Sequence, residues 1–284
     1  MERLNRQKLL VIASHQDDET IIASGAMQQV KAAGGEVQVV YTTDGGGKTT
    51  PGSGQRRELV HRRNDEALTA LALAGVVAAH VHFFGFESGA PFQTPDIARK
   101  VFHAVQEIIG AFQPDKMIVG AFEGGNLEHD ITNFLAVRAA NAAGLARTQI
   151  LEAAEYNRFY LREPVYDRLR KIFPDGFVWP PRFPSGSAGA ILPMTENEQA
   201  IKRKMLECFV SQKHVRLGER FSFAECFRAM PEHDYCAGPF NPDTSWRYRL
   251  QRLLAGSSAF PFAQRDFGPS EYRQLFKTLQ TALS

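Results

Sequence analysis

Leu9-Leu-Val-Ile-Ala-Ser-His-Gln-Asp-Asp-Glu19 is the stretch of the sequence that decides the fold. Its apolar, partly β-branched residues predict a buried central strand, and the polar residues that follow mark the carboxyl end of that strand. In open α/β sheets, ligands bind at this end of the strands. His15 and Asp18 are three residues apart, so a single turn can aim both at one metal ion. Asp17 lies between them and can act on a water molecule.

Strand patterns alternate with helix patterns through the first half of the chain. Such alternation is typical of repeated βαβ units with right-handed crossovers. We therefore predict an α/β fold, with a Rossmann-like, mostly parallel sheet that carries helices on both faces. The predicted strands span residues 9–14, 36–43, 80–85, 116–122 and 148–154, and the predicted helices span 19–33, 55–74, 96–112 and 131–143.

The alternation fades after about residue 155. Residues 173–193 are rich in proline, glycine and aromatic side chains, and Thr195, followed three residues later by Glu198, opens a predicted helix over 195–212 with a capping box. We expect one domain, 1–284, in which a Rossmann-like core over 1–155 is completed by a smaller, irregular C-terminal α+β part over 156–284. A separately folding second domain is the alternative.

The composition is that of an ordinary globular protein, with 44% hydrophobic and 23% charged residues and a net charge of +2. This charge gives no strong field that would select nucleic acid or a membrane surface as a partner. No apolar run approaches the roughly 20 residues that span a bilayer, and the polar N-terminus lacks the pattern of a signal peptide. Three cysteines without a CxxC motif indicate reduced thiols, so we expect a cytoplasmic protein. A homo-oligomer is left open.

A second group of polar residues, Glu123-Gly-Gly-Asn-Leu-Glu-His129, follows the predicted strand 116–122. A catalytic zinc site needs about three protein ligands and an open position for water. His129 is the best candidate for the third ligand, because it lies at the same edge of the sheet as His15 and Asp18. The alternative is that residues 15–19 form a solvated loop and a helix N-terminus, where the helix dipole favours acidic side chains in any case.

These motifs, taken in order, resemble the zinc-dependent PIG-L/LmbE-like N-deacetylases. The segment Ala13-Ser-His-Gln-Asp-Asp-Glu19 resembles the family's (A)HPDDE signature, and Asn126-Leu-Glu-His129 stands where the family has H-x-D-H. Further matches are Thr43-Asp-Gly-Gly-Gly47, Arg63-x-x-Glu66 with Gly75 after the helix, and Lys204 followed by Ser211-Gln212, which resembles a late K…SQ helix. The resemblance covers roughly residues 8 to 230.

The resemblance implies an enzyme that removes an N-acetyl group from an N-acetylated amino sugar, such as an N-acetylglucosamine compound, or from its conjugate. It implies that His15, Asp18 and His129 bind Zn²⁺ and that Asp17 is the general base, which takes a proton from the water that attacks the amide carbonyl. Asp17, having gained that proton, could deliver it to the leaving amine.

Three further residues are candidates for substrate binding: Arg63, Asp44 and Asn126. Arg63 is expected to reach a sugar hydroxyl or an anionic group, and the alternative is a surface pair with Glu66, which would be worth little. Asp44 is expected to hold a sugar hydroxyl, and the alternative is an aspartate that caps a turn before the glycines. The loop 49–55 and the segment 173–193 are expected to build the rim of the pocket.

Two departures from the family pattern keep rival functions open. Gln16 replaces the proline of the first motif, and Asn126 replaces a histidine that serves the family as a charged helper. Asparagine donates a hydrogen bond but carries no proton, so His214 and His233 are considered as substitutes. The rivals are an amidase that cleaves a larger sugar-thiol conjugate and a zinc- or glycan-binding relative with little catalysis. A nucleotide-dependent Rossmann enzyme is disfavoured, because no GxGxxG follows the first strand.

Overall fold

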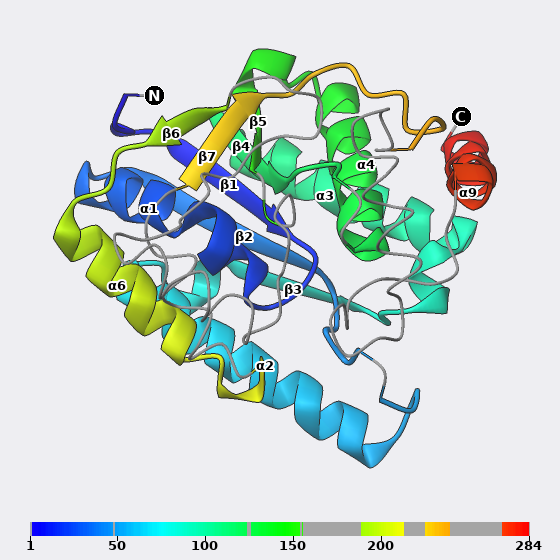
Figure 1. Ribbon diagram of the computed structural model, residues 1–284, viewed down its shortest axis with the longest axis horizontal. Coiled ribbons are helices and arrows are strands. Elements are labelled where there is room, and N and C mark those ends of the chain that lie inside the picture. Colours follow the sequence, from blue (N-terminus) through cyan, green and yellow to red (C-terminus); the bar gives the residue numbers. More distant parts are fainter. Residues whose placement is uncertain are drawn as a thin grey trace, which may run out of the picture.

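The computed structural model describes residues 2–47, 49–123, 126–153, 155, 189–212, 225–238 and 269–283. Within these residues the chain builds one mixed sheet in the strand order β3-β2-β1-β4-β5-β7-β6 (Figure 1). The strands β1 to β5 pair in parallel, whereas β7 runs antiparallel to both β5 and β6. The strands are β1 (Lys8–Ala13), β2 (Glu36–Thr43), β3 (Val81–Phe86), β4 (Lys116–Gly120), β5 (Ile150–Ala153), β6 (Ala190–Leu192) and β7 (Glu225–Ala229).

Helices cover both faces of this sheet (Figure 1). On one face, a hydrophobic cluster joins the sheet to α1 (Asp18–Ala32), α2 (Gly54–Leu73) and α6 (Glu196–Glu207). On the other face, a second cluster joins it to α3 (Pro95–Phe112), α4 (Leu127–Ala142) and α9 (Pro269–Ala282). Short 3₁₀ turns lie at Ala78–His80, Ala90–Gln93, Arg147–Gln149 and Val210–Gln212.

The central strand β1 contributes side chains to both hydrophobic clusters. Leu9 and Val11 belong to the first cluster and Leu10 and Ile12 to the second, and all four are fully buried. Burying a side chain of this size stabilises a fold by about 1.5–3 kcal/mol. A strand covered on both faces has no solvent side, which is why its sequence is a continuous apolar run rather than an alternating one.

The strand order reverses between β1 and β4. From β1 the chain proceeds through α1 to β2 on one side, whereas β4 pairs with the opposite edge of β1 and leads to β5. Two connections thus leave neighbouring strands in opposite directions, which opens a crevice at their carboxyl ends. The segments that follow β1 and β4 carry His15 and His129.

The predicted fold class is confirmed, with differences at several boundaries. Helix α4 begins at Leu127 rather than at 131, because the Asn126 side chain caps it. Helix α6 ends at Glu207, and a 3₁₀ turn takes the place of its predicted last residues. The elements β6, β7 and α9 were not predicted. Of the expected rim segment, residues 173–188 lie outside the described residues, as does His214, and the division of the domain at residue 155 stays a prediction.

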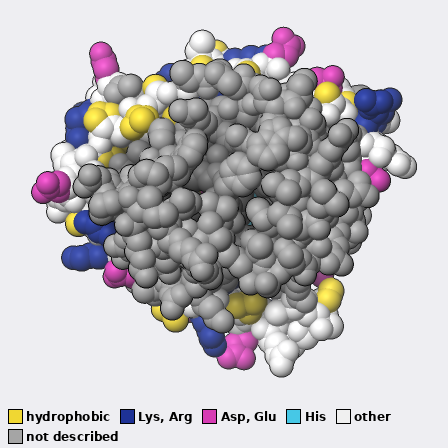
Figure 2. Space-filling model, viewed as in Figure 1, with side chains coloured by type: hydrophobic (Ala, Val, Ile, Leu, Met, Phe, Trp, Pro, Cys, Tyr) yellow, Lys and Arg dark blue, Asp and Glu magenta, His cyan; other side chains and the backbone are white. Residues whose placement is uncertain are grey.

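The surface carries charges of both signs. Around the rim of the face in Figure 2, described Lys and Arg side chains are interspersed with Asp and Glu side chains. This agrees with the net charge of +2. None of the helices in the described part of the chain is long and apolar enough to cross a membrane.

Candidate metal centre

The turn between β1 and α1 presents two of the predicted ligands. Asp17 is the N-cap residue of α1 and has φ 143° and ψ −31°, a backbone conformation that L-residues rarely adopt. Its backbone N–H donates to Glu19 Oε2 at 3.0 Å, and the backbone N–H of His15 donates to Asp18 Oδ2 at 2.8 Å. These bonds fold the turn back on itself, so that the side chains of His15 and Asp18 converge.

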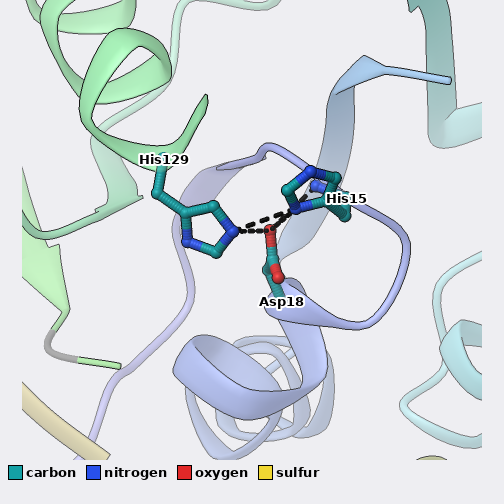
Figure 3. A group of neighbouring side chains, drawn as sticks. All are labelled: His15, Asp18 and His129. Atoms are coloured by element: carbon teal, nitrogen blue, oxygen red, sulfur yellow. Dashed lines mark hydrogen bonds and ion pairs between the residues drawn. The ribbon is translucent and has the colours of Figure 1, made fainter. Parts of the chain in front are cut away.

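His129 meets these two side chains from the first turn of α4 (Figure 3). His15 Nδ1 lies 2.9 Å from His129 Nε2, and Asp18 Oδ2 lies 3.2 Å from His129 Nε2 and 3.4 Å from His15 Nδ1. All three side chains are largely buried. Two residues from one turn and a third more than a hundred positions later therefore direct one ligand atom each at a common point.

This geometry fits a divalent metal ion. Ligand atoms about 2.0–2.2 Å from a tetrahedral zinc ion lie roughly 3.3–3.5 Å from one another, which is close to the three separations between His15, Asp18 and His129. Two imidazole nitrogens and one carboxylate oxygen form a donor set that zinc accepts, and three protein ligands leave a position open. Among the described residues, these three side chains form the one such group whose ligand atoms lie within 4.8 Å of each other.

A carboxylate lies behind each histidine. Glu128 Oε2 is 2.5 Å from His15 Nε2, and Glu155 Oε2 is 3.4 Å from His129 Nδ1. Each imidazole can therefore keep its proton on the outer nitrogen and turn a lone pair towards the common point. Carboxylates in this position fix the tautomer and the orientation of metal-binding histidines.

The charges of the site are strongly coupled. Burial alone would lower the pKa of His15, but the Asp18 and Glu128 carboxylates raise it to about 10. Burial likewise opposes protonation of His129, whose pKa Asp18 and Glu155 raise to about 9. Burial would raise the pKa of Asp18, yet the two histidines hold it well below its usual range. The carboxylates around the common point therefore stabilise positive charge there.

Arg63, a candidate substrate contact, pairs with the candidate base. Its buried guanidinium donates through Nη2 to Asp17 Oδ1 at 3.1 Å. The alternative surface pair with Glu66 is wrong, because the Glu66 carboxylate accepts instead from the backbone N–H and the hydroxyl of Ser211, at 2.9 and 2.6 Å. A contact between Arg63 and substrate stays a prediction.

Asp44 turns its carboxylate towards a second buried arginine. Arg56 donates to it from Nε and Nη2 at 2.8 and 2.7 Å, and Gly46 and Ser88 add three further hydrogen bonds. Burial would raise the pKa of Asp44, but Arg56 and these donors lower it. Asp44 thus caps the turn before the glycines, as the alternative interpretation held, and its contact with a sugar hydroxyl stays a prediction.

Asn126 is the N-cap of α4, where its side-chain oxygen accepts from the backbone N–H of Glu128 at 2.9 Å. This bond fixes the start of the helix that carries Glu128 and His129. Two histidines were considered as substitutes for the missing family histidine. His214 lies outside the described residues, and His233 Nε2 lies 2.6 Å from Glu152 Oε1. Whether Asn126 contacts substrate stays a prediction.

Several residues of the site escaped prediction. Glu155 is a single acid after β5, without a spacing that relates it to His129. Arg56 could have been suspected as a charged residue early in a helix that follows a glycine loop. In the late helix, the structure buries Lys202 completely and leaves Lys204 exposed, and the resemblance of Lys204 and Ser211-Gln212 to a family motif stays a prediction.

Comparison with known proteins agrees with this geometry. Residues 10–140 match the PIG-L family, described as GlcNAc-PI de-N-acetylase, which confirms the resemblance to this family over that part of the chain. No curated protein sequence matches the chain.

Three solved structures share the fold at low sequence identity. The 4-carboxy-2-hydroxymuconate hydratase GalB from Pseudomonas putida has a TM-score of 0.57 and 16% identity, over 80% of this chain and 98% of its own. The pseudoaglycone deacetylase Dbv21 has a TM-score of 0.56 and 16% identity, over 80% and 100%. The zinc-inhibited form of the teicoplanin deacetylase Orf2 has a TM-score of 0.56 and 16% identity, over 78% and 96%.

Proposed function

The chain is a PIG-L (LmbE-like) family protein over residues 10–140, and from this premise we propose that it is a zinc-dependent de-N-acetylase. Its substrate is an N-acetylated amino sugar or an amino-sugar conjugate. The observation that carries the proposal is the convergence of His15, Asp18 and His129 on one point, in a turn of the chain that also carries Asp17.

The proposed reaction divides the work among the residues of the β1–α1 turn and α4. A bound zinc ion would polarise the amide carbonyl and lower the pKa of a water molecule towards about 7. Asp17 takes a proton from the attacking water and returns it to the amide nitrogen as the C–N bond breaks, which yields acetate and the free amine. Glu128 and Glu155 keep both imidazoles deprotonated on the side of the common point. Asp44 and Asn126 remain candidates for contact with the sugar.

The fold by itself does not select this reaction. Deacetylases and a hydratase share it, and one fold commonly hosts several chemistries. The proposal therefore rests on the family match and on the residues of the site.

Metal content and acetate release test the proposal. Purified protein should contain about one zinc ion per chain, and His15→Ala should lose it. Incubation with N-acetylglucosaminyl compounds should release acetate, and Asp17→Asn should abolish most of this release while zinc is retained. If the protein takes up no divalent metal on titration, the proposal is contradicted.

The rival functions give other outcomes in the same assays. A larger amide substrate would release an acid other than acetate together with a free amine. A screen that detects amines would reveal this cleavage. A zinc- or glycan-binding relative would hold zinc and bind sugar, yet release no amine from any compound in the panel.

A further inference from the structure

Two neighbouring residues of α2, Arg63 and Asn64, form hydrogen bonds with the β1–α1 turn. Arg63 Nη2 donates to the carbonyl oxygen of Gln16 at 2.8 Å and to Asp17 Oδ1 at 3.1 Å. Asn64 Oδ1 accepts from the Gln16 side-chain amide at 2.7 Å. One helix thus holds the backbone and the side chains of the two residues that precede the candidate ligand Asp18.

The same arginine ties this turn to the loop after β2. Arg63 Nη1 donates to the carbonyl oxygen of Gly45 at 2.9 Å, and the Gln16 amide lies 3.4 Å from the carbonyl oxygen of Asp44. Gly45 has φ 67°, and a Cβ on it would lie 2.1 Å from Gln16 Oε1, so only glycine permits this close approach. Both guanidinium Nη atoms are therefore engaged within the protein, and the Arg63 side chain is only 7% exposed.

The backbone conformation of Asp17 indicates why the turn needs these hydrogen bonds. Its φ of 143° is unfavourable for a residue with a Cβ, and a strained residue persists only where its surroundings over-determine it. Proline, which restricts a turn through its ring, is absent at position 16. Gln16 instead supplies an amide that Asn64 can hold.

We propose that Arg63, together with the Gln16–Asn64 pair, forms a clamp that positions Asp17 for proton transfer, and that Arg63 acts through Asp17 rather than by binding substrate. The clamp rests on the proposed function, because its effect is read in the rate of acetate release. Arg63 is thus a positioning residue, and Asn64 together with Gln16 replaces the rigidity of a proline.

Steady-state kinetics separate positioning from substrate binding. Arg63→Gln should lower kcat by about 10- to 100-fold, because small misplacements of a catalytic group cost this much, while KM and zinc content stay near the wild-type values. In an Asp17→Asn background the same substitution should cause little further loss, since groups that act as a unit are not additive. The matched control is Arg62→Gln, which removes an exposed arginine one position earlier in α2 and should change neither constant.

A second pair of variants tests the role of Gln16. Asn64→Ala should lower kcat, and the double variant Gln16→Pro/Asn64→Ala should recover most of it, because the ring restricts the turn and keeps the carbonyl that Arg63 binds. Failure of proline to recover the activity would overturn this part of the clamp. An Arg63→Gln variant with raised KM and unchanged kcat, or with a further loss on top of Asp17→Asn, would overturn the positioning role.

Thermal unfolding tests whether Arg63 holds Asp17 without the use of any substrate. If the wild-type protein releases no acetate, the proposed function fails, yet Arg63→Gln and Asp17→Asn can still be compared by Tm in a double-mutant cycle. The clamp predicts that the two losses overlap, so that the double variant melts no lower than the less stable single variant. Additive losses would show that Arg63 does not hold Asp17.

Discussion

Two carboxylates decide how the candidate ligand histidines are presented. Glu128 accepts from His15 and also from the backbone N–H of Gly89, both at 2.5 Å, so a bond from the turn after β3 fixes its position. Glu155 lies 3.4 Å from His129 and is itself buried. Burial raises the pKa of Glu155 to about 7, with a further contribution from Asp18.

Removing either carboxylate should weaken zinc binding without removing a ligand. We expect Glu128→Gln and Glu155→Gln each to lower zinc affinity by about 10–100-fold, the usual effect of losing the partner of a metal-binding histidine. Competition with a chromophoric chelator measures this affinity. Glu232→Gln is the control, because the Glu232 side chain is 87% exposed. Unchanged affinity in both buried variants would mean that the histidines are oriented by packing alone.

Zinc affinity should fall as the pH is lowered. The pKa values of His15 and His129 are raised, to about 10 and about 9, so both imidazoles tend to hold protons at neutral pH when the metal is absent. Their facing nitrogens are 2.9 Å apart, which leaves room for one proton between them. Zinc must displace that proton, so affinity should rise by about tenfold per pH unit below the raised pKa values. Chelator competition between pH 6 and pH 8 would reveal it, and a flat profile would contradict it.

Helix α1, which begins at the site, is hydrogen-bonded in its middle by the side chains of a buried ion pair. Lys202 Nζ lies 2.8 Å from Glu225 Oε1 and donates to the carbonyl oxygen of Ile21 at 2.7 Å. Glu225 also accepts from the backbone N–H groups of Gly25 and Ala26, at 2.7 and 3.1 Å. Side chains from α6 and β7 thus bond to backbone groups in the middle of α1 and join three elements of the fold.

Breaking this ion pair should destabilise the fold strongly. Lys202→Met leaves the Glu225 carboxylate buried without its cation, and such a loss costs about 3–5 kcal/mol. Lys204→Met, two residues later on the exposed side of α6, should stay within about 0.5 kcal/mol. Chemical denaturation followed by circular dichroism compares the two. Equal effects would show that the buried pair contributes nothing beyond its packing.

The same pair explains why part of the C-terminal region resists prediction. In β7, Glu225-Cys-Phe-Arg-Ala229, the first residue is charged but fully buried, because its partner Lys202 comes from another element. Strand β6 has only three residues, too few to show a period of two. Two lysines two positions apart in α6 look alike in sequence, and only the distant glutamate decides which one is buried.

At the scale of the whole molecule, the predictable parts are those set by local pattern. The β1 run has no polar alternation because helices cover both of its faces, and the ligand residues follow two strands that the topology makes neighbours. The partners of those residues were not predictable in the same way. Glu155 lies 26 positions after His129, and Arg63 lies 46 positions after Asp17. Only the folded sheet brings the two members of each pair together.

The candidate metal centre joins the two layers of the molecule, and this has a measurable consequence. His15 and Asp18 lie in the turn that leads into α1, on one face of the sheet, whereas His129 belongs to α4 on the other face. An ion held by all three side chains would stabilise the folded state, by about 2.7 kcal/mol when free zinc is about a hundred times its Kd. Zinc should therefore raise Tm by several degrees, and scanning calorimetry with and without zinc measures the shift.

A matched pair of histidine variants assigns that shift to the site. His129→Ala removes the ligand from the α4 layer, so zinc should no longer raise Tm. His61→Ala removes a histidine whose side chain is 82% exposed on α2, and the shift should persist. Loss of the shift in both variants, or in neither, would mean that the stabilising ion binds elsewhere on the protein. If only His129→Ala loses the shift, the ion that stabilises both layers binds at the carboxyl ends of β1 and β4.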